Sequence, residues 1–232
     1  MNDDRDILKH QIDYYRARAN EYDEWFFRKG RYDRGDEHRS VWAAEVAQVQ
    51  AALKDARPSG KILELACGTG LWSQQLLPFS DDLTVVDASP EMLDLCRRRL
   101  DSETVTFIQS DLFEWQPDET YDFVFFSFWL SHVPADRFPG FWKLVEIALK
   151  PKGHVFFVDS LYTESSSAVD HKPIGQKGTT ERKLNDGQTF EIVKIFYEPS
   201  ALCEQLAELG WKGAVYSTDQ FFLYGHVCRA DR

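Results

Sequence analysis

The hydrophobic and polar positions follow two different periods along the chain, and the change of period marks the predicted elements. Between residues 61 and 159, short apolar runs alternate with amphipathic stretches whose apolar positions recur at helical spacing. Buried strands give the first pattern and helices that cover a sheet give the second. Their regular alternation predicts an α/β fold with a mostly parallel sheet and right-handed crossovers.

The central strands and helices can be placed from this pattern. The predicted strands start at residue 62 and continue at 83–86, 105–108, 121–128 and 154–158. The predicted helices between them cover 71–77, 89–100 and 138–149. Ser89 and Pro90 form an N-cap and first-turn pair. The run at 121–128 is apolar at almost every position, which is typical of a strand buried on both faces.

Amphipathic helices are predicted before the first strand. One spans 6–28, with Tyr15 and Tyr22 on its apolar face and charged residues opposite. The sequence GRYDRG at 30–35 interrupts this pattern, and a second helix follows at about 40–53. The pair either covers a sheet edge or forms a lid over a site, and the two interpretations are compatible.

The chain changes character after Asp159. Residues 160–186 are polar, and long loops in compact domains are usually functional or disordered. Asp186-Gly187 predicts a hairpin with a strand at 189–196, followed by a helix from Pro199 to Gly210. A terminal strand pair is predicted at 211–217 and 220–228. We therefore expect one domain over 1–232, divided into a helical lid (1–57), a core (58–160), an excursion over the site (161–197) and a C-terminal helix with two strands (198–232).

Composition and charge exclude several classes of function. The 232 residues carry a net charge of −11, which disfavours a nucleic-acid backbone or an anionic membrane as the main partner. Four cysteines without a CxxC pair, and histidines without an HExxH motif, predict neither a disulfide framework nor a metal site. No apolar signal core or membrane-length segment is found, so a soluble cytoplasmic protein is expected.

The most informative stretch is ILELACGTG, at residues 62–70. An apolar strand pattern ends there in a short loop of small residues, and a helical stretch follows. Ala66, Gly68 and Gly70 leave room for a ligand close to the backbone. A dinucleotide fingerprint requires a third glycine where this chain has Ser73, so a nicotinamide oxidoreductase is disfavoured.

The wording acidic-x-Ala-Cys-Gly-x-Gly, which begins at Glu64, resembles motif I of the class I S-adenosylmethionine-dependent methyltransferases. The resemblance is specific over about residues 61–159. It implies a Rossmann-like, doubly wound, mostly parallel seven-stranded sheet with an N-terminal helical lid and an extra strand or excursion after the fifth strand. It also implies S-adenosyl-L-methionine as cofactor and S-adenosyl-L-homocysteine as product.

The resemblance assigns cofactor-binding roles residue by residue. Asp87 ends the second strand, where the family holds the ribose hydroxyls, although it could merely cap the next helix. Asp111 matches the family position that accepts a hydrogen bond from the adenine amino group. Met92 matches an apolar contact to adenine, or is core. The implied cofactor set is Tyr22, Glu64, Ala66, Cys67, Gly68, Gly70, Asp87, Ala88, Met92, Asp111 and Leu112.

The acceptor is expected after the fourth strand, at residues 127–132. The (Asp/Asn)-Pro-Pro-Tyr motif of DNA and protein-glutamine methyltransferases is absent there, which argues against those substrates. His132 could act as a general base, or could cap a helix or pack near the cofactor. The predicted acceptor contacts are Trp25, Trp129, His132 and Arg182; Arg31, Arg34 and Lys183 could also hold a carboxylate of the substrate.

The sequence thus predicts methyl transfer from S-adenosylmethionine to a small organic acceptor, at oxygen or nitrogen, by in-line displacement. Two alternatives remain: methylation of a protein, and a methyltransferase fold that binds without catalysis.

Overall fold

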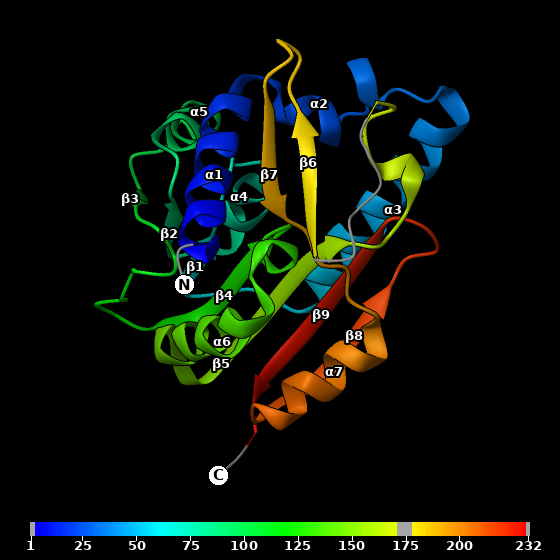
Figure 1. Ribbon diagram of the computed structural model, residues 1–232. Coiled ribbons are helices and arrows are strands. Elements are labelled where there is room, and N and C mark those ends of the chain that lie inside the picture. Colours follow the sequence, from blue (N-terminus) through cyan, green and yellow to red (C-terminus); the bar gives the residue numbers. More distant parts are fainter. Residues whose placement is uncertain (1–2, 171–177, 231–232) are drawn as a thin grey trace.

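The structure is a computed structural model and describes residues 3–170 and 178–230. Its centre is a seven-stranded sheet in the order β3-β2-β1-β4-β5-β9-β8 (Figure 1). The strands of this sheet are β1 (Lys61–Leu65), β2 (Asp82–Asp87), β3 (Val105–Gln109), β4 (Tyr121–Ser127), β5 (Leu149–Ser160), β8 (Trp211–Ser217) and β9 (Phe222–Arg229). The first five are parallel, and β9 pairs antiparallel with both β5 and β8. The predicted fold class is confirmed.

Helices cover both faces of the sheet because its central strands are apolar on both sides. On β4, Phe125 packs toward one face and Phe126 toward the other, and both are fully buried. The helices on the Phe125 side are α3 (Asp36–Asp55), α4 (Ser73–Leu76) and α5 (Pro90–Leu100). Those on the Phe126 side are α6 (Phe138–Ala148) and α7 (Pro199–Glu208). The sheet is therefore doubly wound.

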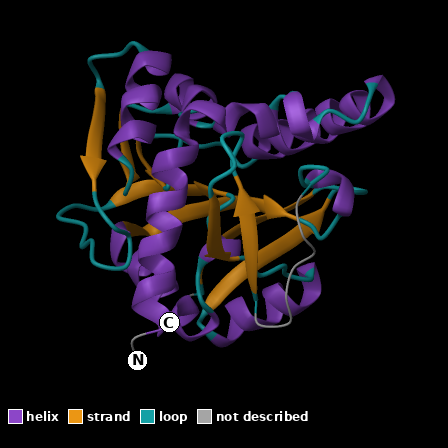
Figure 2. Cartoon of the chain, turned by 45° about the horizontal axis from the view of Figure 1, so that its top comes forward, coloured by secondary structure: helices purple, strands orange, loops and turns teal. Residues whose placement is uncertain are grey.

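The segment after β5 forms a separate hairpin. Strands β6 (Thr179–Lys183) and β7 (Thr189–Val193) pair only with each other among the described strands, around the turn at Gly187. The hairpin stands beside α1 (Asp3–Arg18), as Figures 1 and 2 both show. The excursion thus returns to the N-terminal helix, far away in sequence. The predicted turn at Asp186-Gly187 is confirmed.

The N-terminal helix differs from the prediction in two ways. It ends at Arg18, a 3₁₀ turn (Ala19–Glu21) follows, and a short helix α2 (Tyr22–Phe26) continues the chain. Side-chain contacts hold the chain just after this break. The Asp23 carboxylate accepts a hydrogen bond from the Thr69 hydroxyl at 2.6 Å and forms an ion pair with Arg99. In addition, α1 is buried over more than its predicted apolar face, because Tyr14 and Arg18, which flank Tyr15, are also buried, toward the hairpin.

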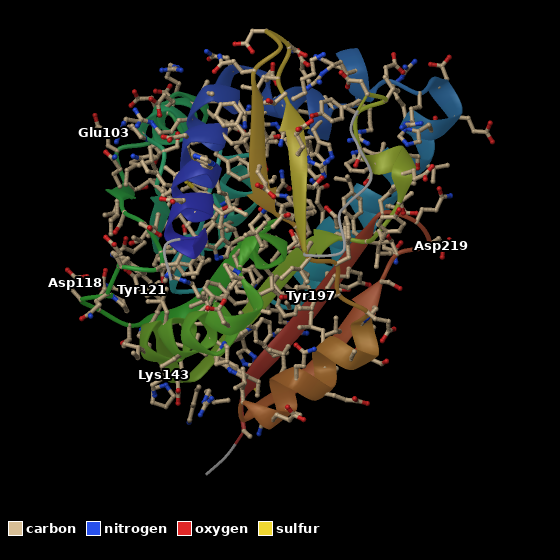
Figure 3. All side chains as sticks on the ribbon, viewed as in Figure 1. Glu103, Asp118, Tyr121, Lys143, Tyr197 and Asp219 are labelled. Atoms are coloured by element: carbon tan, nitrogen blue, oxygen red, sulfur yellow. The ribbon has the colours of Figure 1, made fainter. Side chains whose placement is uncertain are left out.

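Acidic side chains lie on the outside of the molecule. Glu103, Asp118 and Asp219 are exposed at its periphery, where Figure 3 labels them. These three negative charges are therefore solvated. Within the described residues, no helix is long and apolar enough to cross a membrane.

Candidate active site

A pocket opens where the strand order of the sheet reverses. Strand β1 lies between β2 and β4, and ligands of open α/β sheets bind at the carboxyl ends of the strands beside such a reversal. This central pocket encloses about 700 Å³ of empty space, within the usual range for small-molecule sites. Its lining includes Leu8, Ile12, Tyr15, Tyr22, Ala66, Gly68, Asp87, Ala88, Met92, Asp111, Leu112, Phe113, Phe128, Trp129 and His132.

The loop after β1 contains two glycines, Gly68 and Gly70, which are required for different reasons. Gly68 has a φ of 55°, and a Cβ there would meet nothing closer than the Tyr22 ring at 3.9 Å, so the backbone is open to a ligand. Gly70 has a φ of 83°, and a Cβ there would lie 2.7 Å from the Cys96 sulfur. Gly70 therefore allows α5 to pack against the loop, whereas Gly68 keeps the pocket wall flat.

Asp87 joins the loop to the next helix. Its Oδ2 accepts a hydrogen bond from the Gly68 N–H and its Oδ1 accepts one from the Ser89 N–H, both at 2.9 Å. Ser89 itself caps α5 by accepting from the Met92 N–H, so helix capping does not account for Asp87. Burial raises the pKa of Asp87 to about 6 against these hydrogen bonds, and the side chain lines the pocket. It is a carboxylate placed to accept further hydrogen bonds from hydroxyl groups.

Glu64 lies below the pocket rather than in its wall. It is fully buried, its Oε2 accepts from the Ser73 hydroxyl, and its Oε1 has no hydrogen-bond partner. Burial holds the pKa of Glu64 well above its usual range. The open wall at Gly68 and the two carboxylates Asp87 and Asp111 in the pocket wall fit a ligand rich in hydroxyl and amino donors, as the implied cofactor is.

A second pocket adjoins the first and is lined by cations. This cationic pocket encloses about 550 Å³. Arg18, Arg182 and Lys194 all lie in its wall, and each is only 8% exposed. Its wall is completed by Tyr14, Tyr15, Tyr22, Trp25, Tyr32, Phe128, His132, Ser160, Ser166, Ser167, Ile192 and Phe196. No carboxylate of the described residues lines it.

The three cations have few partners of opposite charge. Lys194 lies 3.6 Å from Asp159 and donates to the Ser131 hydroxyl at 2.7 Å. Arg18 donates to the Tyr32 hydroxyl at 3.2 Å, and its Nε has no partner. Arg182 donates to the Thr180 hydroxyl at 3.3 Å. Burial lowers the pKa of Lys194 to about 8, against the pull of Asp159, and burial also lowers the pKa of Arg182.

Four residues lie in the walls of both pockets and form the border between them: Tyr15, Tyr22, Phe128 and His132. Phe128 follows β4 with a φ of 52°, an unusual conformation for a side chain of this size. Such strain is typical of functional sites. The Arg18 guanidinium lies 4.9 Å from the centre of the Tyr22 ring, so one cation is next to the border.

His132 is bonded through both ring nitrogens. Its Nε2 lies 2.7 Å from the Tyr15 hydroxyl, and its Nδ1 lies 2.7 Å from the Val193 carbonyl oxygen. A carbonyl can only accept, so Nδ1 carries a proton, and in the neutral ring Nε2 accepts from Tyr15. Burial, reinforced by Lys194, holds the pKa of His132 well below its usual range. The general-base role remains a prediction.

The sequence-predicted residues divide between the pockets. Trp129 lines the central pocket, packed near Phe113, rather than the cationic pocket. Trp25 and Arg182 line the cationic pocket. Cys67 and Gly70, like Glu64, belong to the structure beneath the central pocket and are absent from its wall.

Arg31 and Arg34, which the sequence also suggested as contacts for a substrate carboxylate, instead bind other segments of the chain. Arg31 pairs with Asp170, and Arg34 donates to the Glu164 carbonyl. Lys183 is likewise absent from the walls of both pockets. The sequence analysis missed Arg18 and Lys194 as site residues. The helical spacing of Gln11, Tyr14 and Arg18 is a signal that could have indicated the second buried face of α1.

Metal-ligating residues do not gather in the described part of the chain. No group of three or more His, Cys, Asp or Glu side chains there is arranged to hold an ion.

Comparison with known proteins places the chain in a family. A family model described as "Methyltransferase domain" matches residues 62–153. Malonyl-[acyl-carrier protein] O-methyltransferase 1 of Ilyobacter polytropus is 32% identical over 90 residues, 34% of each chain. Demethylmenaquinone methyltransferase of Clavibacter sepedonicus is 33% identical over 127 residues, 53% of this chain and 51% of that protein. The chain thus matches a third to a half of the length of these curated relatives.

Two solved structures are similar over nearly their whole length. The DhpI-SAM-HEP complex is 36% identical with a TM-score of 0.80, and the alignment covers 96% of this chain and 97% of that chain. The DhpI-SAH complex is 37% identical with a TM-score of 0.78, covering 97% and 98%. The similarity therefore includes the N-terminal helices and the hairpin as well as the central sheet.

Proposed function

The chain belongs to the class I S-adenosylmethionine-dependent methyltransferases, and we propose that it methylates an oxygen of a small organic acid. The central pocket would hold the cofactor. The cationic pocket would hold the acid, through a carboxylate, phosphonate or phosphate group. The product would be a methyl ester with one negative charge fewer than the acceptor.

One observation carries the proposal: three buried cations face a pocket without a carboxylate in its described wall. Burying an unpaired ion costs several kcal/mol, and Asp159 compensates only Lys194. An anionic ligand would compensate Arg18 and Arg182, and a guanidinium suits the oxygens of an acid because it can donate two parallel hydrogen bonds. The similar DhpI-SAM-HEP complex contains a second component besides SAM, which supports a site for two ligands.

The border between the pockets favours the acid oxygen itself as nucleophile. Arg18 lies next to Tyr22, and Tyr22 borders both pockets. An acid group held by Arg18 would therefore be close to the cofactor side. An ionised oxygen already has a lone pair available, so no base is required, in keeping with a histidine whose nitrogens are both engaged.

The remaining catalysis would come from alignment and exclusion of water. When bound, S-adenosylmethionine supplies an electrophilic methyl group on a sulfonium. The aromatic side chains of the border would favour positive charge beside them and keep water out. Holding two reactants in line can contribute about 7–11 kcal/mol in favourable cases. The lid helix α1 serves both pockets, because Tyr15 lies in both walls and Arg18 in one.

The test is turnover with a panel of small acids. Carboxylic, phosphonic and phosphoric acids, together with uncharged phenols and amines, are incubated with S-adenosylmethionine and the products are identified by mass spectrometry and NMR. We expect O-methyl esters of one class of acid. N-methylated amines, or methyl ethers of uncharged phenols in place of esters, would contradict the proposal.

Two arginines of α1 offer a matched pair of variants. Arg18→Gln removes a buried cation of the pocket, and we expect KM for the acid to rise roughly 30-fold or more, as for other buried charge pairs. Arg16→Gln removes an exposed arginine of the same helix that pairs with Glu91, and we expect little change. Equal effects of the two variants would mean that the cationic pocket does not bind the acceptor.

A further inference from the structure

The lid helix is held by a group of hydrogen bonds at the border of the two pockets. Tyr15 of α1 bonds to the His132 ring, which follows β4. Gln11, one turn earlier, donates to the His132 carbonyl and accepts from the Val193 N–H, each at 3.2 Å. The His132 Nδ1 bonds to the Val193 carbonyl at the end of β7. Three elements distant in sequence therefore meet around one imidazole, here called the His132 junction (Gln11, Tyr15, His132 and Val193).

We propose that His132 is a positioning residue that fixes Tyr15, and with it α1, across the border of the two pockets, and that it takes no proton from the acceptor. The proposal rests on the acid acceptor proposed above, because an ionised oxygen has no proton to lose. It replaces the general-base role that the sequence suggests for the same residue.

The bonding of the ring supports positioning. A base must offer a free lone pair to the proton that it removes, within hydrogen-bond reach. The Nε2 lone pair of His132 already accepts from the Tyr15 hydroxyl at 2.7 Å, and Nδ1 is protonated toward the Val193 carbonyl. The two bonds fix the tautomer and the plane of the ring. Through these two bonds the ring connects α1 to the end of β7.

The charges around the ring point the same way. The groups that face His132 are the Tyr15 hydroxyl and Arg18 from α1, Arg182 from β6 and Lys194 just after β7. Three of these four are cations, and they disfavour a second positive charge on the imidazole. A neutral histidine is thus the expected state across the working pH range, and a neutral ring is what the Tyr15 hydrogen bond requires.

Positioning at this place would affect both ligands. Tyr15 lies in the walls of both pockets, and its ring is 6.3 Å from that of Tyr22 and 5.4 Å from that of His132. Because α1 also contributes Leu8 and Ile12 to the central pocket and Arg18 to the cationic pocket, displacement of the helix would open both. The His132 junction therefore links the closure of one pocket to that of the other.

The decisive variant is His132→Gln. A glutamine amide can accept from Tyr15 near the position of Nε2, but it cannot act as a base at neutral pH. We expect kcat of His132→Gln to stay within about fivefold of wild type, with the acid identified in the panel above as acceptor. His132→Ala and Tyr15→Phe both lose the hydrogen bond, and each should raise KM for the acid and weaken S-adenosylhomocysteine binding by roughly 3–10-fold.

A base would behave differently. Loss of a general base typically costs 10²–10⁴-fold in rate, so a fall of about 100-fold or more in kcat for His132→Gln, with KM unchanged, would overturn the proposal. A wild-type kcat that falls tenfold per pH unit on the acid side, with the limb absent in the variant, would do the same. We expect that the titration of His132 causes no such fall in kcat.

A spectroscopic test separates this proposal from the acceptor proposal. Nitrogen-15 NMR of the ring should show the neutral tautomer with the proton on Nδ1 for His132 from about pH 6 to 9, with S-adenosylhomocysteine alone, and Tyr15→Phe should shift the Nε2 signal. Observation of the Nε2-protonated tautomer would overturn the positioning role even if esters are formed. Failure of the acid panel with the expected tautomer intact would instead count against the acceptor.

Discussion

The two pockets share a border but are built in different ways. The central pocket is made largely by residues that directly follow β1, β2, β3 and β4, with carboxylates and open backbone facing inward. The cationic pocket takes its charges from two segments that are far apart in sequence, with Arg18 on α1 and both Arg182 and Lys194 from the β6–β7 hairpin region. One pocket thus belongs to the sheet, whereas the other exists only where α1 and the excursion with its hairpin meet.

This difference teaches that the fold determines the proposed cofactor site, whereas the proposed acceptor site depends on the additions to the fold. Carboxyl ends of parallel strands meet at one edge of the sheet whatever covers them. The cations meet only if α1 and β6–β7 pack as they do, through contacts such as Tyr14 with Phe190, whose rings lie 5.7 Å apart. Substitutions should therefore separate the two sites cleanly.

The largest expected effect is on the central pocket. Asp87→Ala removes a carboxylate that can accept two hydrogen bonds from a bound hydroxyl pair and that also holds the Gly68 N–H. Hydrogen bonds to a charged group contribute about 1.5–3 kcal/mol each, so we expect S-adenosylhomocysteine to bind roughly 100-fold more weakly or worse. Calorimetric titration measures it. Asp94→Ala, an exposed acid of α5 paired with Arg97, is the matched control.

If Asp87→Ala bound S-adenosylhomocysteine as tightly as the wild type does, Asp87 would not hold the ribose. The central pocket would then not be the cofactor site in the comparison of the two pockets. The same variant should leave the charges of the cationic pocket in place, so binding of the acid alone should change by less than about threefold.

The sequence was sufficient for the central pocket because its parts are local. A strand, a loop of small residues and a helix follow one another in ILELACGTG, and an acid stands where β2 ends. Asp87, Asp111 and Gly68 lie in the wall of the central pocket, and their cofactor-binding roles stay a prediction. Glu64, Cys67 and Gly70 support that wall from below, a distinction that requires the packing of α5 against the loop and that no local pattern contains.

The cationic pocket could be predicted only in part, because its contacts join residues far apart in sequence. Arg182 was identified as a candidate, but so were Arg31 and Arg34, which brace loops. A helical pattern cannot say that its polar face, with Gln11 and Arg18, will be covered by a hairpin some 170 residues later. The hairpin register, which brings Val193 to His132, is likewise a tertiary fact.

A smaller effect is expected when the loop geometry is changed without touching a charge. Gly70→Ala would force a side chain into left-handed backbone with a φ of 83° and place its Cβ 2.7 Å from the Cys96 sulfur. We expect a loss of about 2 kcal/mol in the free energy of unfolding, measured with denaturant. Thermofluor melting with S-adenosylhomocysteine should show a weakened response as well.

Gly187→Ala is the control for backbone strain alone. Gly187 has a φ of 94°, but a Cβ there would meet nothing within 4 Å. It should cost about 1 kcal/mol, and the difference between the variants measures the clash with α5. Equal losses would mean that the close packing of loop and helix contributes little to the central pocket.

The smallest expected effect distinguishes the pockets by pH. Burial raises the pKa of Asp87 to about 6 and lowers that of Lys194 to about 8. Below pH 6, Asp87 takes up a proton and loses acceptor capacity, so thioether affinity should fall by up to tenfold between pH 7 and 5. Above pH 8, Lys194 loses its proton, and the affinity for the acid should fall by several-fold between pH 7.5 and 9.5.

The loss of affinity at low pH should therefore be seen for the thioether, and the loss at high pH for the acid. An anion in the cationic pocket favours protonated Lys194, so its binding should take up a proton near pH 8.5; a ligand that requires the Asp87 carboxylate should release one near pH 5.5. Calorimetry in buffers of different ionisation enthalpy measures both. Lys194→Met should remove the alkaline limb for the acid and leave the acid limb for the thioether. If Lys194→Met changed the pH dependence of both the acid and the thioether, the charge of Lys194 would act on both pockets. The two pockets would then be separate in their geometry but not in their electrostatics.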